Sequence, residues 1–197
     1  MAKNVFISFR YKDGHKYKEE IESLFDKSVD TVDFSEDIDR SNYSEYTIRN
    51  YLYKKLRRSS VTIIILTPEA VNHQKDYWGR YNDWVYDEIR YSLEERENNR
   101  TNGLIAVYTP EAAPFICKKE PSGTTTIFRF DNLARENMMN VKPEYKKNTE
   151  NGIYNRDYDS YCSLIPYDDF KQNFAEYIKI ASWKRDNKNR YDIVKRL

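Results

Sequence analysis

The run VTIIIL at residues 61–66 limits the possible folds of this chain more than any other stretch. Its residues are apolar or β-branched at odd and even positions alike, so both faces of a strand built from them need cover. A strand with one face in water instead alternates apolar and polar residues. Thr67 and Pro68 then end the strand. We therefore expect a central strand of a parallel sheet.

Strand and helix patterns alternate on both sides of this run. Short apolar runs predict further strands at residues 4–9, 31–34, 104–108 and 125–130. Apolar residues at helical spacing predict helices over residues 17–25, 48–56 and 81–93. Parallel neighbours need crossover connections of this kind, so the alternation predicts an α/β sandwich around a mostly parallel sheet of five strands.

The C-terminal third has a different pattern. Residues 131–167 are rich in Asn, Tyr, Lys and Glu with little periodicity, which predicts an irregular insertion. A helical stripe then predicts a closing helix over about residues 168–183, and residues 184–197 read as a charged, partly frayed tail. We expect a single domain over residues 1–197, with its core at about 4–130.

Charge and composition narrow the choice of partners and compartment. With 33 Lys and Arg against 32 Asp and Glu, the net charge of +1 gives no general attraction to nucleic acid or to an anionic membrane. The sequence contains neither a basic segment followed by an apolar leader nor an apolar run long enough to span a bilayer. We expect a cytoplasmic protein that recognises its partner at a local site.

Several kinds of catalytic site are absent from the sequence. The five glycines form neither a dinucleotide-binding fingerprint nor a phosphate-binding P-loop. Two histidines are too few for a clustered zinc site, and the chain lacks the Gly-x-Ser-x-Gly turn of many serine hydrolases. Asp37, Asp39 and Ser41 match the start of a calcium loop, but Asn42 and Ile48 occupy its glycine and glutamate positions. We expect no bound metal.

The helix over residues 81–93 carries the strongest candidate for a reactive group. Trp84 and Glu88 form an i, i+4 pair beside the apolar stripe, so Glu88 lies at the edge of the buried face. Asn82 or Asp83 can act as the N-cap, which puts Glu88 in the first or second turn, where the helix dipole favours a carboxylate. A solvated helix acid beside a core tryptophan produces the same pattern. The stripe itself consists of Val85, Ile89 and Leu93.

Ligands of open α/β sheets bind beyond the carboxyl ends of the strands. Four segments of this chain are expected at that edge. They are residues 8–13, residues 35–42, Thr67 with its neighbours, and the start of the helix that carries Glu88.

Together these stretches resemble a Toll/interleukin receptor (TIR) domain, and in particular the bacterial TIR-like proteins of Thoeris anti-phage defence systems. The resemblance covers about residues 4–130. It rests on the first strand with its loop, NVFISFRYKD, on the acidic loop before the second helix, on VTIIILTP, and on the Trp84-x-x-x-Glu88 pattern.

The resemblance implies a flavodoxin-like three-layer fold and an enzyme that cleaves the nicotinamide–ribose bond of NAD. NAD is then the substrate, and no cofactor is expected. In bacterial relatives the product is often converted to a cyclic ADP-ribose isomer that signals to an effector, here expected to be separately encoded. By position in the motifs, Glu88 matches the catalytic glutamate. The residues that match substrate-binding positions are Ser8, Phe9, Arg10, Asp37 and Trp84.

Two other functions fit the same residues. A non-catalytic TIR adaptor would bind other TIR domains, including copies of itself, through the charged loop at residues 35–46. A metal-dependent nuclease would use Asp37 and Asp39. The first predicts self-association without NAD turnover, and the second predicts dependence on a divalent metal.

Overall fold

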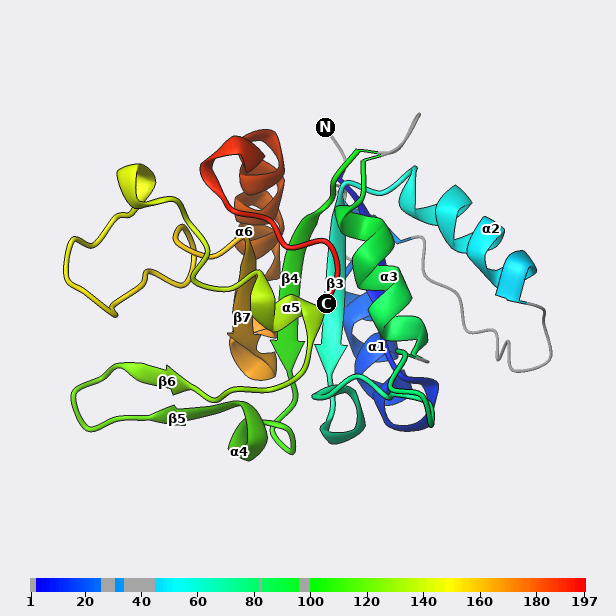
Figure 1. The fold of residues 1–197 in the computed structure, drawn as a ribbon, viewed down its shortest axis with the longest axis horizontal. Coiled ribbons are helices and arrows are strands. Elements are labelled where there is room, and N and C mark those ends of the chain that lie inside the picture. Colours follow the sequence, from blue (N-terminus) through cyan, green and yellow to red (C-terminus); the bar gives the residue numbers. More distant parts are fainter. Residues whose placement is uncertain (1–2, 26–30, 34–44, 82, 96–99) are drawn as a thin grey trace.

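A computed structural model describes residues 3–25, 31–33, 45–81, 83–95 and 100–197. Five parallel strands form one sheet in the order β2-β1-β3-β4-β7 (Figure 1). β3 is central, as its sequence predicts. The strands are β1 (Lys3–Ser8), β2 (Thr31–Asp33), β3 (Val61–Leu66), β4 (Gly103–Tyr108) and β7 (Cys162–Pro166).

Helices cover both faces of the sheet. Ile63 and Ile65 of β3 are buried against α1 (Tyr11–Phe25) and α6 (Tyr167–Asp186). Ile64 and Leu66 are buried on the opposite face, in a core shared with α3 (Trp84–Leu93) and α5 (Leu133–Glu136). α2 (Glu45–Leu56) packs beside α3. Every residue of β3 and β4 is buried, which explains why these strands are apolar throughout. The flavodoxin-like three-layer fold is confirmed.

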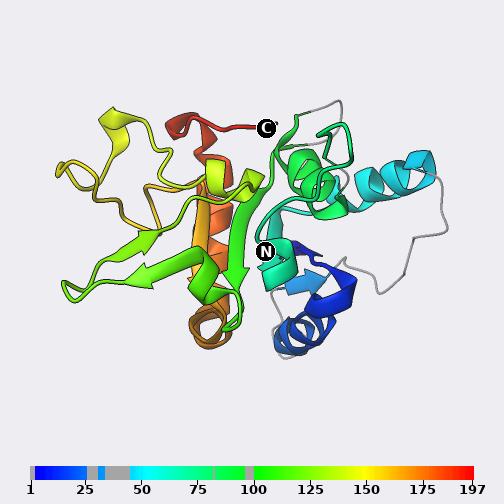
Figure 2. The same cartoon turned by 60° about the horizontal axis from the view of Figure 1, so that its bottom comes forward.

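The fifth strand of the sheet is β7, so the prediction of that strand at residues 125–130 was wrong. Residues Thr125–Ile127 form β6, which pairs antiparallel with β5 (Cys117–Lys119) in a separate hairpin that projects from the sheet (Figure 2). Most of this hairpin is exposed, whereas Cys162 to Ile165 are buried and fill the place beside β4. The stretch 131–167 therefore supplies a core strand, in addition to α5 and irregular segments.

The last eleven residues are docked on the domain, and the expectation of a frayed tail was wrong. After α6 and the short helix Lys188–Arg190, the side chain of Asn137 donates to the carbonyl oxygen of Val194 at 2.8 Å and accepts from its N–H at 3.0 Å. Arg196 bonds the Glu94 carboxylate at the end of α3 at 2.9 Å. The tail therefore ties α5 to α3. None of the helices in the described ranges has the length and apolar character needed to cross a membrane.

The stability of this core depends on pH through the hydroxyl groups of its buried tyrosines. Burial, followed by the hydrogen bond that its hydroxyl donates to Glu111 at 2.6 Å, raises the pKa of Tyr17 to about 12. Burial and the nearby Asp169 carboxylate raise the pKa of Tyr177 to about 12. Lys184 is fully buried between α6 and β7, and burial lowers its pKa to about 8.

We expect the domain to lose stability above about pH 10.5. Tyrosine in the unfolded chain titrates near pH 10. Its raised pKa in the folded state therefore contributes stability that is complete below that pH and is lost as the pH rises towards 12. Lys184 acts in the opposite direction between about pH 8 and 10.5. Urea midpoints measured across this range test the expectation. In a Tyr17→Phe, Tyr177→Phe variant the alkaline loss should be shallower; an unchanged slope contradicts it.

Candidate functional site

The strand order places a topological switch point between β1 and β3. From β1 the chain passes to β2 on one side, and from β3 it passes to β4 on the other. The helices that follow these two strands lie on opposite faces of the sheet. In open α/β sheets ligands bind in the crevice at the carboxyl ends of strands arranged in this way, and this edge is here called the crevice. β1 ends at Ser8 and β3 at Leu66, so the connections after these residues border the crevice.

α3 begins at this edge with Asp83 as its N-cap. The Asp83 carboxylate accepts a hydrogen bond from the backbone N–H of Val85 at 3.0 Å, which confirms one of the two predicted caps. The helix begins at Trp84, three residues later than predicted, because Lys75 and Tyr81 pair across a turn that precedes the cap. Trp84 is 41% exposed in the first turn. Glu88 follows one turn later and is half-buried.

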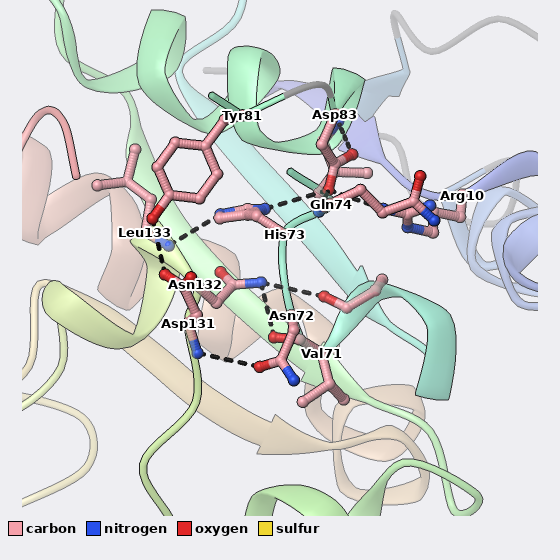
Figure 3. Close-up of polar contacts among 12 residues, drawn as sticks. Arg10, Val71, Asn72, His73, Gln74, Tyr81, Asp83, Asp131, Asn132 and Leu133 are labelled. Atoms are coloured by element: carbon pink, nitrogen blue, oxygen red, sulfur yellow. Dashed lines mark hydrogen bonds and ion pairs between the residues drawn. The ribbon is translucent and has the colours of Figure 1, made fainter. Parts of the chain in front are cut away.

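The side chain of Asp83 also joins the two connections that border the crevice (Figure 3). Its Oδ2 accepts from the guanidinium of Arg10, in the β1–α1 connection, at 2.8 Å. The same oxygen lies 3.2 Å from Nδ1 of His73, in the β3–α3 connection. Burial opposes ionisation of Asp83, but the bond from His73 and the charge of Arg10 outweigh it, so the pKa of this carboxyl lies below its ordinary value. Asp83 therefore holds both loops as a carboxylate.

The remaining predicted site residues take different positions. Ser8 is fully buried, and its hydroxyl has no hydrogen-bond partner within the described ranges. Phe9 packs with the core on the α1 side, next to Gly14 and His15, and so belongs to the face opposite α3. Asp37 lies outside the described residues. Arg10 is thus brought to the start of α3, whereas Phe9 is not.

His73 is the member of this site that the sequence did not single out. Its side chain is fully buried, and its Nε2 accepts a hydrogen bond from the backbone N–H of Leu133, sixty residues along the chain, at 2.9 Å. A single histidine in a loop gives little indication, from the sequence alone, that it belongs to a site. Only its place between a buried strand and a helix cap could have suggested a structural role.

Replacement of Asp83 by Asn should lower the free energy of unfolding by about 1–2 kcal/mol, because the oxygen that accepts from Arg10 and His73 is replaced by an amide nitrogen. Asn is as good an N-cap as Asp, so the helix start is preserved. Arg10→Gln and the double variant complete a double-mutant cycle in urea unfolding. We expect the double variant to be less destabilised than the sum of the single variants. Strict additivity would show that the pair contributes nothing.

The sheet order, the helix layers and the crevice at β1 and β3 define a flavodoxin-like α/β domain of the TIR-like class. The family model described as "Thoeris protein ThsB, TIR-like domain" matches residues 6–114. This is more than half of the chain, and the chain belongs to that family. It is therefore a TIR-domain protein of Thoeris defence. The match begins within β1, includes β3, α3 and β4, and ends before the β5–β6 hairpin, α5 and β7.

Proposed function

We propose that this protein cleaves the nicotinamide–ribose bond of NAD and converts the product to a cyclic ADP-ribose isomer that signals to a separately encoded effector. The observation that carries the proposal is the position of Glu88. It lies in the second turn of a helix whose first turn is fixed, through Asp83 and Arg10, at the switch point of the sheet. Membership of the TIR-like family supports the same reaction.

One carboxylate is enough for this chemistry. When the bond between the ribose C1′ and the nicotinamide nitrogen breaks, its electron pair stays on that nitrogen, so nicotinamide leaves as a neutral molecule without a proton donor. Positive charge develops on the ribose, and the Glu88 carboxylate can stabilise it. Glycosidases need a second acid because their leaving group is an alkoxide.

The surroundings of Glu88 also suit a dinucleotide. α1 begins directly after β1 at this edge, and the N–H groups at its N-terminus favour an anion such as the pyrophosphate of NAD; the N-terminus of α3 is already capped by the Asp83 carboxylate. Ser8, at the end of β1, stays a predicted substrate-binding residue; its hydroxyl is buried and lacks a hydrogen-bond partner among the described residues, so contact with a ribose hydroxyl requires the end of β1 to open. Water that captures the ribosyl cation yields ADP-ribose and releases a proton. Capture by a nitrogen of the adenine in the same molecule yields the cyclic isomer, and exclusion of water by Trp84 favours this route.

Mass spectrometry of reaction products tests the proposal. Purified protein is incubated with NAD, with and without a lysate of phage-infected cells as the source of an activating component. We expect equal amounts of nicotinamide and of a product with the mass of cyclic ADP-ribose. Linear ADP-ribose alone would overturn the cyclisation step. Absence of nicotinamide under both conditions would overturn the enzyme assignment.

A second candidate is an adaptor that binds partner proteins, including other copies of this chain. Most of the loop predicted to mediate this, residues 35–46, lies outside the described residues. A different feature favours partner binding: Tyr77 is 95% exposed and Trp78 74% exposed at the tip of the turn before α3. The Asp76 carboxylate accepts from the N–H groups of Trp78 and Arg80, both at 2.9 Å, so the turn is held in shape. Exposed, pre-ordered aromatic residues are typical of protein interfaces.

Light scattering separates the two candidates. An adaptor should self-associate, a Tyr77→Ser, Trp78→Ser variant should be monomeric, and neither protein should consume NAD. Turnover of NAD by a monomeric protein would instead favour the enzyme.

A further inference from the structure

A segment beyond the family match holds the connection between β3 and α3. The backbone N–H of His73 donates to the carbonyl oxygen of Asp131 at 2.9 Å, and the N–H of Asp131 donates to Oδ1 of Asn72 at 3.0 Å. The Asp131 carboxylate accepts from the hydroxyl of Tyr81 at 2.8 Å (Figure 3). It also pairs with Lys75 at 2.7 Å. Asp131 thus ties down both ends of the turn that precedes α3.

The next residue strengthens this attachment from inside the core. Asn132 is fully buried, and its amide nitrogen donates to the carbonyl oxygens of Ala70 and Val71 at 3.0 and 3.2 Å. Its amide oxygen accepts from the N–H of Ala134 at 2.9 Å and so caps α5. These bonds satisfy backbone groups of a connection that has no ladder partner there. The start of α5 and the connection after β3 therefore form one unit.

His73 connects the segment Asp131–Leu133 to α3, the helix that carries Glu88. Because Nε2 accepts the N–H of Leu133, the ring proton must lie on Nδ1, which faces Asp83. The ring is fixed further by edge contacts with Tyr81 and Tyr86, whose centroids lie 5.6 and 4.9 Å away. The bonds then run without a gap from Leu133 through His73 to Asp83, and from Asp83 to Arg10 and to the first turn of α3.

We propose that His73 is a positioning residue for the NAD-cleaving site, through which the segment Asp131–Leu133 sets the orientation of Asp83 and thus of the α3 helix that carries Glu88. This inference rests on the proposed function. The same geometry excludes His73 as a general acid or base, because both ring nitrogens are engaged and the side chain is fully buried. Its effect on the reaction is therefore indirect, through the start of α3.

Three variants separate positioning from mere packing. In His73→Asn the amide nitrogen takes the place of Nδ1 and still donates to Asp83, and the backbone N–H of residue 73 still donates to Asp131, so the segment Asp131–Leu133 stays connected to Asp83. In His73→Gln the amide oxygen takes the place of Nε2 and still accepts from Leu133, but the bond to Asp83 is lost. We expect His73→Gln and His73→Ala to lower kcat for NAD cleavage about 100-fold, the order of loss that a misplacement of about 1 Å produces. The KM for NAD should change less than about threefold, and His73→Asn should recover most of kcat. If His73→Ala does not fold, the comparison of the Asn and Gln variants still tests the positioning role, because their side chains differ by one methylene group.

Two results would overturn the inference: equal kcat values for the Asn and Gln variants, or an effect confined to KM.

A second measurement, by NMR, does not depend on enzymatic activity. The chain has two histidines, so ¹⁵N spectra of labelled imidazoles can be assigned, and His73 should carry its proton on Nδ1. The amide signals of Trp84 and Val85 should shift in His73→Gln and stay in place in His73→Asn. A proton on Nε2, or shifts of equal size, would reject the positioning role even if NAD is cleaved. Absence of NAD cleavage together with the expected spectra would instead reject only the proposed function.

Discussion

Glu88→Gln is expected to lower the rate of NAD cleavage about 100- to 1,000-fold, the scale on which a single stabilising group acts in a preorganised site. Glutamine has nearly the same size as glutamate and keeps the half-buried position in the second turn of α3. It lacks the negative charge that the developing ribosyl cation needs. The loss should therefore appear in kcat, with little change in the urea midpoint or in NAD binding measured by calorimetry.

Asp87→Asn is the matched control for this experiment. Asp87 precedes Glu88 on the same helix and forms an ion pair with Arg90 at 3.0 Å, so its replacement removes one carboxylate from α3 and keeps Glu88. We expect turnover within about threefold of the unmodified protein, because an ion pair on a helix contributes only about 0.5 kcal/mol. Nicotinamide release that persists in Glu88→Gln would show that another group performs the reaction.

Gly103→Ala is expected to cause the largest loss of stability, about 3 kcal/mol or more. Gly103 opens β4 where α6 crosses the sheet, and a Cβ built on it would collide with the backbone carbonyl of Ala181, whose carbon would lie 2.6 Å away. Both β4 and α6 contribute backbone to this contact, and backbone cannot change rotamer to relieve a clash as a side chain can. α6 must therefore move off the sheet, and the core that it covers loses contacts.

Gly14→Ala provides the comparison in urea unfolding. Gly14 is also buried, but an added methyl would meet Cβ and the ring atom Cδ2 of Phe9 at 3.2 and 3.3 Å, and a side chain can shift by a few tenths of an ångström. Alanine is also favoured over glycine inside a helix by about 1 kcal/mol, so we expect little net change. Similar midpoints for the two variants would refute the account of α6 packing given for Gly103.

The central part of the fold could be predicted because its signals are local. VTIIIL and the apolar run before Pro110 need cover on both faces, and only the middle of a parallel sheet provides it. The stripe on α3 and its cap at Asp83 follow from helical periodicity and N-cap preference in the same way. The TIR-like family could be identified from these same stretches, and this identification is confirmed. The catalytic role of Glu88 stays a prediction.

The edge strand and the hairpin could not be predicted because local pattern and position disagree. TTIFRF at residues 125–130 has strand composition, yet the chain beyond β4 leaves the sheet and this segment pairs with β5 outside it. CSLIP in β7 is short and lies in a polar, tyrosine-rich stretch, so its apolar residues give a weak signal. The two candidate strands differ in which of them pairs with β4, and this pairing depends on the assembled sheet and not on the local sequence.

The site network was missed for a related reason. The bonds of His73 join residues that are ten and sixty positions apart, and no spacing rule connects them. Asp83 could be recognised as a cap, but not as the shared partner of Arg10 and His73. Contacts of this kind arise only when the connections after β1 and β3 meet at one edge of the sheet.

The late arrival of β7 has a consequence for synthesis on the ribosome. Until residues 162–166 emerge, one side of β4 presents a row of unpaired backbone groups flanked by apolar side chains, the arrangement that most readily joins another nascent chain. A polypeptide released at the end of the matched stretch, residue 114, would keep that open border permanently and should precipitate.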